Sequence, residues 1–406
     1  MSVLLYIDPG TGSILFSLII GLVTTVYFVA KQAFIALKLK LLGSSNAAQS
    51  RATHTIVIYS EGSQYWTVFQ PVLDELERRN VKATYLTSAE NDPFFSKGYS
   101  CIAGEFIGKG MTAFSRLTFL EADICLMTTP GLDVYQLKRS RGVRHYCHLL
   151  HDVGDANCYR LFGLDYFDSV LLSGEYQIAG IRELERKRDI PAKELIVVGS
   201  TYLDALSAIA ENSRDGRSGD FTVLVAPSWG KSGILSRYGS SLLDPLVQTG
   251  YRVIIRPHPQ SRASEATMLA ALEKRYASCA NVEWDSSRDN VGVLSRANVM
   301  ISDFSGVIFD YAFLFDRPFV FLNQAFDPRP YDAFDSSEKP WKFSAFSEIG
   351  REITPSDFPE IGAILTSVAA DKSLSAARAR TRDVAWQRRG EAGKLVSDFL
   401  VSKARV

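Results

Sequence analysis

Two short segments in the second half of the chain place phosphate-binding groups after strand-like runs. The first, Ser302 to Gly306 (S-D-F-S-G), separates the strand-like run 297–302 from an apolar run of helical length, 307–315. A strand that turns directly into a helix aims free backbone N–H groups and the positive end of the helix dipole at one point, which suits a phosphate. Ser302 and Ser305 would add hydroxyls. An ordinary N-cap, with Ser or Asp satisfying the first turn and nothing bound, explains the pattern equally well.

The second segment, R-P-H-P, ends the strand-like run Tyr251 to Arg256. Two prolines fix the backbone on both sides of His258. In an open α/β sheet ligands bind beyond the carboxyl ends of the strands, so Arg256, His258 and the serine turn would lie together. His258 would donate to a phosphate oxygen and Arg256 would add a fixed charge. The alternative is a histidine in a surface turn, which the serine turn downstream disfavours.

A third group, His145, Cys147, His148 and His151, invites a zinc interpretation. On a strand, however, residues 145, 147, 149 and 151 share one face and 148 points away, so the four side chains would not converge. We therefore expect His145 and His148 to be packing or hydrogen-bonded structural residues.

The amino-acid composition gives information on the class of partner and on the redox state of the cysteines. The 406 residues contain 45 Lys+Arg and 45 Asp+Glu, so no global charge indicates a nucleic acid as partner. The five cysteines are widely spread and include no C-x-x-C, which is typical of reduced thiols in a cytosol.

The N-terminal region, residues 1–43, has the pattern of a membrane anchor. Ser13 to Ala30 carries no charge and would span about 27 Å as a helix, near the minimum for a bilayer core. Asp8 precedes this run and Lys31, Lys38 and Lys40 follow it, so the positive-inside rule puts the rest of the chain in the cytoplasm. We expect a single-pass protein of the inner (cytoplasmic) membrane, with a basic helix to about Leu42 on the inner leaflet. The alternative is a buried helix of a soluble protein.

The remaining chain alternates strand and helix patterns, which indicates an α/β fold with parallel sheets covered on both faces. After a polar linker we expect two doubly wound, Rossmann-like domains, 52–212 and 220–385, then a C-terminal helix within 386–406. The most polar run, 211–220, would connect the domains, and a cleft between them would hold the substrate. The aromatic-rich segment 325–346 has no clear period and is expected to be a loop facing that cleft. The expected strands are 54–60, 81–86, 123–127, 145–150, 168–172 and 194–198, then 221–226, 251–256, 282–285, 298–302 and 318–322.

Five segments between about His145 and Asn323 together resemble the CDP-glycerol glycerophosphotransferases, the teichoic acid primases and polymerases. Leu150-His151-Asp152 stands where that family has W-H-G, and Gly199-Ser200-Thr201-Tyr202-Leu203-Asp204 where it has G-x-P-R-x-D. Leu224-Val225-Ala226-Pro227-Ser228-Trp229 resembles A-P-T-W, and Arg256-Pro257-His258-Pro259 is similar to R/K-x-H-P. Ile301-Ser302-Asp303-Phe304-Ser305-Gly306-Val307-Ile308-Phe309-Asp310 resembles S/T-D-x-S-S-x-x-x-D.

The resemblance implies a GT-B fold and a catalytic base, His151, that takes the proton of an acceptor hydroxyl. It implies that His258, a second catalytic residue, and the Ser302/Ser305 turn bind the donor pyrophosphate. The remaining residues that it implies are Arg256, Asp303, Gly306 and Asp310 on the donor phosphates, Pro227, Ser228 and Trp229 near the nucleotide, and Asp152, Gly199 and Asp204 on the acceptor side. A base near neutral pKa and donors that stabilise the leaving nucleotide are what such a transfer needs, so no metal is required.

Three positions depart from the family pattern: Asp152 and Gly306 replace a glycine and a serine, and Gly230 stands where an arginine usually follows the tryptophan. We expect a membrane-anchored transferase that moves glycerol phosphate, or a related polyol phosphate, from a CDP-activated donor to a lipid-linked or cell-envelope polymer acceptor. The alternatives are a GT-B glycosyltransferase that uses a nucleotide sugar, and a non-catalytic, membrane-tethered binding module.

Overall fold

A computed structural model describes residues 20–27, 30, 54–212, 219–287, 290–323 and 326–404. The chain forms two compact units, Met1–Thr53 and His54–Val406. In the first unit, residues 20–27 are helical and exposed. In the parts of the chain that the structure describes, no helix is both long enough and apolar enough to cross a bilayer. The predicted membrane helix at 13–30, the basic helix after it and the polar linker lie largely outside the described residues.

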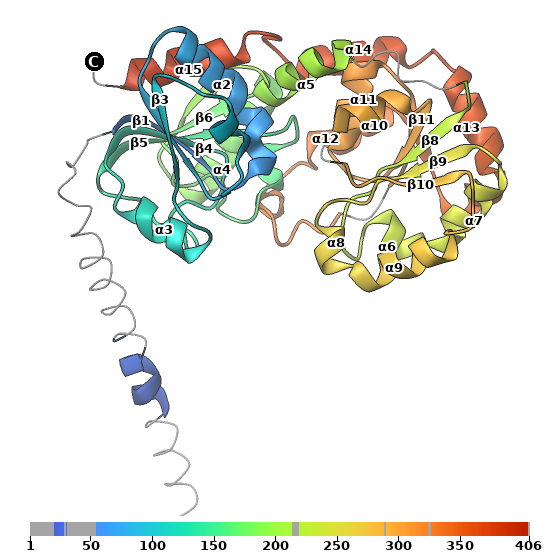
Figure 1. Cartoon of the computed structure of the whole chain (residues 1–406), viewed down its shortest axis with the longest axis horizontal. Coiled ribbons are helices and arrows are strands. Elements are labelled where there is room, and N and C mark those ends of the chain that lie inside the picture. Colours follow the sequence, from blue (N-terminus) through green and yellow to red (C-terminus); the bar gives the residue numbers. More distant parts are fainter. Residues whose placement is uncertain are drawn as a thin grey trace, which may run out of the picture. The chain divides into compact units, whose positions relative to one another are not determined.

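The second unit begins with a parallel sheet of seven strands built around β1 (His54–Ser60) (Figure 1). The strand order is β3-β2-β1-β4-β5-β6-β7. Its inner strands are apolar runs that are buried on both faces, as expected for a parallel sheet that helices cover on both sides. The other six strands are β2 (Ala83–Thr87), β3 (Ile102–Phe106), β4 (Ala122–Met127), β5 (Val143–Leu149), β6 (Ser169–Leu172) and β7 (Glu194–Val197).

Helices cover both faces of this first sheet. Two of them, α3 (Met111–Thr118) and α4 (Ile178–Arg188), pack on one face. The other face holds α2 (Trp66–Arg78) and, from the far end of the sequence, α15 (Ala392–Lys403). Short 3-10 helices η1 (Ser63–Tyr65), η2 (Pro93–Ser96), η3 (Ala156–Cys158) and η4 (Glu175–Gln177) lie in the connections.

A second parallel sheet of six strands follows, in the order β10-β9-β8-β11-β12-β13. The strands are β8 (Thr222–Val225), β9 (Arg252–Ile255), β10 (Val282–Trp284), β11 (Val299–Ser302), β12 (Phe319–Leu322) and β13 (Arg351–Ile353). One face packs on α6 (Ile234–Tyr238), α7 (Ser240–Gln248), α9 (Ala266–Arg275) and α13 (Ile361–Ala370), and the other on α10 (Asn290–Arg296), α11 (Val307–Phe315) and α12 (Trp341–Ile349). The remaining helices are α5 (Thr201–Asn212), α8 (Ser261–Ser264), α14 (Ser375–Ala385), η5 (Asp332–Phe334) and η6 (Pro355–Glu360).

The α/β class and the two doubly wound parallel sheets are therefore as predicted, and every predicted strand is present within a few residues. Two strands, β3 and β13, were not predicted. Each stands at the edge of its sheet, and most of their residues are exposed, so neither needs the apolar run by which the buried strands are recognised. The predicted domain boundaries stay a prediction.

The prediction of a loop for 325–346 was correct only in part. Residues 326–330 and 335–340 have no helix or strand, as expected, but from Trp341 onward the segment is helix α12, and its 3-10 turn η5 contacts α4 through Asp332 and Arg188. Asp332, which is 1% exposed, accepts hydrogen bonds from the backbone N–H groups of Phe162 (2.6 Å) and Gly163 (3.2 Å). It also pairs with the Arg188 guanidinium at 2.6 Å. This cluster joins α4 of the first sheet to the segment after β12 of the second.

A second connection runs through the turn that follows β7. Asp204 accepts hydrogen bonds from the Trp386 indole N–H (2.9 Å) and from the backbone N–H groups of Gly390 (2.8 Å) and Ala392 (3.1 Å). Gly199 has φ +89° and lies so close to this crossing segment that an added Cβ would stand 2.5 Å from the Gln387 carbonyl oxygen. Only glycine fits both conditions. The turn thus holds the crossing between α14 and α15.

Candidate active site

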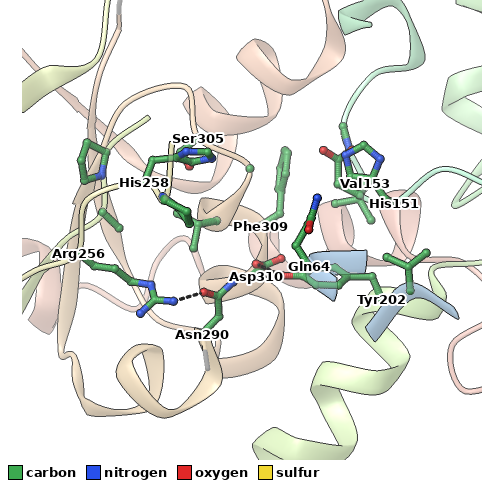
Figure 2. A pocket seen from close by; sticks show the side chains of 18 of the residues that line it. Gln64, His151, Val153, Tyr202, Arg256, His258, Asn290, Ser305, Phe309 and Asp310 are labelled. Atoms are coloured by element: carbon green, nitrogen blue, oxygen red, sulfur yellow. Dashed lines mark hydrogen bonds between the residues drawn. The ribbon is translucent and has the colours of Figure 1, made fainter. Parts of the chain in front are cut away.

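A cavity of about 320 Å³ lies where the carboxyl ends of the two sheets face each other (Figure 2). In each sheet the order of connections reverses at the central strand pair, β1/β4 and β8/β11, and ligands of open α/β sheets bind at such a switch point. The first sheet contributes Gln64, Tyr65, Val68, residues 151–154 and Tyr202 to the lining. The second contributes Ala226, Pro227, residues 256–259, Asn290, residues 305–307, Phe309 and Asp310.

The amino end of α11 opens into this cavity without a side-chain cap. The part of the N-cap alternative in which Ser or Asp caps the first turn is therefore wrong, whereas the binding of an anion at this helix end stays a prediction. Ser302 and Asp303 both turn inward: the Ser302 hydroxyl donates to the Ala226 carbonyl at 2.6 Å, and Asp303 accepts the backbone N–H groups of Ser228 (2.9 Å) and Ile234 (3.0 Å). These contacts bind the loop after β8 to the turn after β11. Ser305 and Gly306 remain at the cavity wall. The N–H groups of Ile308 and Phe309 donate to the Ser305 (3.2 Å) and Gly306 (2.9 Å) carbonyls, so the part of the helix terminus that suits an anion is its first residue, Val307.

His258 lines the same wall of the cavity (Figure 2). Its Nδ1 accepts the backbone N–H of Gln260 at 3.1 Å, which leaves Nε2 to carry the proton of the neutral ring. Burial lowers the pKa of His258, against an opposing effect of Glu265. The residue is therefore a neutral N–H donor toward the cavity at physiological pH.

Arg256 reaches the cavity as part of a chain of polar contacts. Its guanidinium pairs with Asp285 and donates to Asn290 Oδ1 at 2.5 Å (Figure 2). Asn290 in turn donates to the Tyr202 hydroxyl at 3.3 Å, and that hydroxyl donates to Asp310 Oδ2 at 2.8 Å. The chain links β9, α10, α5 and α11, and it crosses from the second sheet to the helix that follows the first.

His151 lies on the opposite wall, beyond the end of β5 (Figure 2). Its Nδ1 stands 3.1 Å from both Thr128 Oγ1 and the Tyr159 hydroxyl oxygen. The Tyr65 ring meets it edge-on, with 5.4 Å between ring centroids. The next residue, Asp152, accepts the Gly154 N–H at 2.8 Å through Oδ1 and also lines the cavity. This wall therefore offers an imidazole and a carboxylate, and the facing wall offers N–H and hydroxyl donors.

Residues 206–334 match the family described as CDP-Glycerol:Poly(glycerophosphate) glycerophosphotransferase. Through these residues, about a third of the chain, the sequence is similar to the CDP-glycerol glycerophosphotransferase family. The match contains the entire wall that β8, β9, α10 and α11 contribute to the cavity. No curated protein matches the sequence.

Solved structures agree on the fold. The wall teichoic acid polymerase TagF gives a TM-score of 0.56 at 16% identity, over 86% of this chain and 89% of that one. A substituted TagF soaked with CDPG has a TM-score of 0.55 at 15% identity, and the match covers 92% of this chain and 96% of that one. UDP-GlcNAc 2-epimerase from Neisseria meningitidis, bound to UDP-GlcNAc, has a TM-score of 0.52 at 14% identity, and the match covers 86% of this chain and 99% of that one. These likenesses confirm the predicted GT-B type of α/β fold.

Several residues that the glycerophosphotransferase resemblance placed at the site lie elsewhere. Ser302 and Asp303 are buried beneath the turn, and Ser228 lies behind the loop that Asp303 holds. Trp229 is 47% exposed beside the cavity, with its ring 6.3 Å from that of His258. Gly199 and Asp204, predicted on the acceptor side, instead fix the crossing to α15. The cavity brings together His151, Asp152, Pro227, Arg256, His258, Ser305, Gly306 and Asp310.

Two departures from the glycerophosphotransferase pattern have local explanations. Gly230 has φ +87° in the loop after β8, a conformation that strains any residue with a Cβ. At Gly306, φ is −60°, and an added Cβ would stand 4.0 Å from Asp152 Oδ2, an ordinary contact. The first departure is therefore required by the backbone, whereas a serine would fit at the second.

The prediction that His148 points away from His151 was wrong. Strand β5 ends at Leu149, so the alternation of faces does not extend to residue 151, and both imidazoles reach the Tyr159 hydroxyl. His145 lies on the other face of the sheet and contacts Ser169 and Phe399. Sequence reasoning also missed Tyr159, Tyr202 and Asn290. Tyr202 falls within a motif that was recognised, but no local pattern singles out the other two.

Asp310 makes the folded protein's stability depend on pH. Burial, together with the charge of Asp152, raises its pKa to about 7, and the Tyr202 hydrogen bond opposes this. Because the folded state holds the proton more tightly than the unfolded chain, stability falls as pH rises from 3.8 to about 7. Relative to Asp310→Asn, which keeps an oxygen for Tyr202, we expect the wild type to lose roughly 2.5 kcal/mol between about pH 5 and pH 8.

Urea unfolding of both proteins across that pH range measures the difference. Glu90→Gln, a change at an exposed carboxylate outside the cavity, is the matched control and should keep the wild-type slope. Parallel curves for the wild type and Asp310→Asn would show that Asp310 is ionised throughout.

Proposed function

We propose that this enzyme transfers glycerol phosphate, or a related polyol phosphate, from a CDP-activated donor to a lipid-linked or cell-envelope polymer acceptor. The observation that carries the proposal is the coincidence of the family match with one wall of the cavity. Residues 206–334 supply Arg256, His258, Ser305 and Asp310, whereas His151 and Asp152 face them from outside the match. The matched wall is assigned to the donor and the other wall to the acceptor.

The donor wall holds a diphosphate through uncharged donors. His258 Nε2–H, the Ser305 hydroxyl and the amino end of α11 at Val307 line the same cavity, and all three favour an anion. Arg256 adds a cation that Asp285 partly neutralises. We propose that no metal ion is needed, because these groups stabilise the leaving nucleotide by themselves.

The acceptor wall supplies the base. His151 takes the proton of the acceptor hydroxyl as its oxygen attacks the phosphorus that carries the glycerol. A new phosphorus–oxygen bond forms to the acceptor, the bond to the cytidine phosphate breaks, and CMP leaves with the electron pair. A positioned imidazole contributes about 10² to 10⁴ in rate to such a step.

The anchor completes the proposal. A helix at 13–30, followed by lysines, would hold the enzyme on the cytoplasmic face of the membrane, near a lipid-linked acceptor. What supports this is the charge order of the sequence, Asp8 before the apolar run and lysines after it.

The donor is identified by thermal stabilisation of the full-length protein. CDP-glycerol, CDP-ribitol, CMP, UDP-sugars and GDP-sugars are compared, and a true donor adds about 2.7 kcal/mol to stability at a hundredfold excess over Kd. We expect the cytidine compounds alone to stabilise the protein. Stabilisation by a uridine or guanosine sugar instead would make the protein a glycosyltransferase, and stabilisation by none of them would favour a binding module.

A further inference from the structure

The hydroxyl of Tyr159 lies between two histidines of the first sheet. Its oxygen is 3.2 Å from His148 Nε2 and 3.1 Å from His151 Nδ1. A tyrosine hydroxyl has one proton and two lone pairs, so it donates to at most one of the two imidazoles. The direction of this arrangement decides which nitrogen of His151 carries the proton, and therefore whether the cavity receives a base or a donor.

The surroundings of His151 Nδ1 set that direction. Thr128 Oγ1 and the Tyr159 oxygen both stand 3.1 Å from Nδ1. One N–H can be shared between two oxygens, as in the three-centre bonds that are common in proteins. One ring lone pair cannot accept two O–H groups equally well. Two equal distances therefore indicate that Nδ1 carries the proton and that Nε2 presents a bare lone pair.

Tyr159 then has to donate its own proton to His148. That histidine is fully buried and is also packed edge-on against Tyr159 and Phe167. Burial, with a smaller effect from His151, lowers the pKa of His148 to about 3, so the ring stays neutral and Nε2 is free to accept. Its proton lies on Nδ1, which has no hydrogen-bond partner among the described residues. This orientation therefore carries the cost of one buried N–H without a partner.

We propose that Tyr159 and His148 are positioning residues that hold His151 in the tautomer with a basic Nε2. The inference rests on the proposed function of His151 as the base. His148 draws the Tyr159 proton away from His151, and the Tyr159 oxygen accepts the Nδ1 proton together with Thr128. After the base has taken the acceptor proton, that proton stays on His151, because the buried His148 does not accept a second one.

Nuclear magnetic resonance of the full chain labelled with ¹⁵N in histidine tests the tautomer directly. The five histidines, His54, His145, His148, His151 and His258, give few enough signals to assign, and the His151 signals are those missing from His151→Ala. At about pH 8, where an unperturbed imidazole is neutral, we expect His151 to carry its proton on Nδ1. A proton on Nε2 in the wild type would overturn the proposal.

Substitution of His148 gives the sharper test. In His148→Phe the ring packing is kept but Tyr159 loses its acceptor, so its proton turns to His151 and the tautomer reverses. In the double variant His148→Phe/Tyr159→Phe the competing hydroxyl is gone, Thr128 alone accepts the Nδ1 proton, and the tautomer returns. Should His148→Phe fail to fold, the wild-type spectrum still shows which nitrogen of His151 carries the proton.

Kinetics follow the same pattern. With CDP-glycerol and a synthetic lipid-linked glycerol phosphate as acceptor, His148→Phe should lower kcat by about tenfold or more and leave KM for the donor unchanged. The double variant should be more active than His148→Phe. A purely structural role predicts the reverse, with the double variant the worst of the three. Tyr166→Phe, which removes an exposed hydroxyl outside the cavity, is the matched control.

The spectroscopic readout separates this inference from the proposed function. If CDP-glycerol is not turned over but the tautomer pattern is as expected, the function fails and the positioning of His151 stands. If turnover is observed but the tautomer of His151 does not respond to His148, the positioning role fails alone.

Discussion

His151→Ala should lower the turnover of CDP-glycerol by about 10² to 10⁴-fold, because the acceptor hydroxyl would lose the group that takes its proton. Binding of the donor should survive, since the groups assigned to its phosphates lie on the opposite wall of the cavity. The variant should therefore still be stabilised by CDP-glycerol in a thermal unfolding experiment. Release of CMP, measured at saturating donor, reports the loss of turnover.

The matched control is His54→Ala. His54 begins β1, contacts Thr84 through Nδ1 at 3.0 Å and lies outside the cavity. Its loss should leave turnover at the wild-type level. Undiminished transfer by His151→Ala would exclude the assigned mechanism, and loss of both turnover and donor binding would show that His151 shapes the donor site.

Asp332→Ala should destabilise the fold by about 2–5 kcal/mol, because it leaves two backbone N–H groups without an acceptor, each at a cost of about 1–3 kcal/mol, and removes one of the three carboxylates that pair with Arg188. Arg188 is 8% exposed and Asp332 1% in their side chains, and the guanidinium also pairs with Asp165 and Asp335. The two N–H groups that lose their acceptor are those of Phe162 and Gly163. The midpoint of urea unfolding should fall markedly.

Asp327→Ala provides the comparison for that experiment. Asp327 pairs with Arg329 in the same segment, but the two side chains are 50% and 77% exposed. Exposed pairs of this kind contribute little, so the midpoint should not move measurably. Equal midpoints for Asp332→Ala and Asp327→Ala would mean that the buried cluster contributes no net stability.

The sequence predicted the parts of the site that depend on strand ends. His151, His258 and Ser305 follow different strands by two or three residues, and carboxyl ends of parallel strands meet at one edge. The three side chains converge because of the strand order, and the strands themselves can be recognised in the sequence as apolar runs. Their chemical roles at the site stay predictions.

The direction of individual side chains could not be predicted in the same way. Asp303 points away from the cavity because it accepts hydrogen bonds from two N–H groups of a loop about 70 residues earlier in the sequence. No local sequence pattern predicts that contact. Tyr159 and Asn290 reach the site through tertiary contacts alone. Part of the segment 325–346 was misassigned because its aromatic residues pack between elements from both sheets rather than along one amphipathic face.

The path of the chain from α14 to α15 has a consequence for biosynthesis. Val396, Phe399 and Leu400 of α15 belong to the same buried cluster as Val68, Phe69 and Leu73 of α2. A ribosome therefore releases the whole second sheet before the helix that completes the core of the first one. The later half of the sequence can fold while the earlier half still exposes an apolar face on α2, which makes that face a natural point for chaperone contact during synthesis.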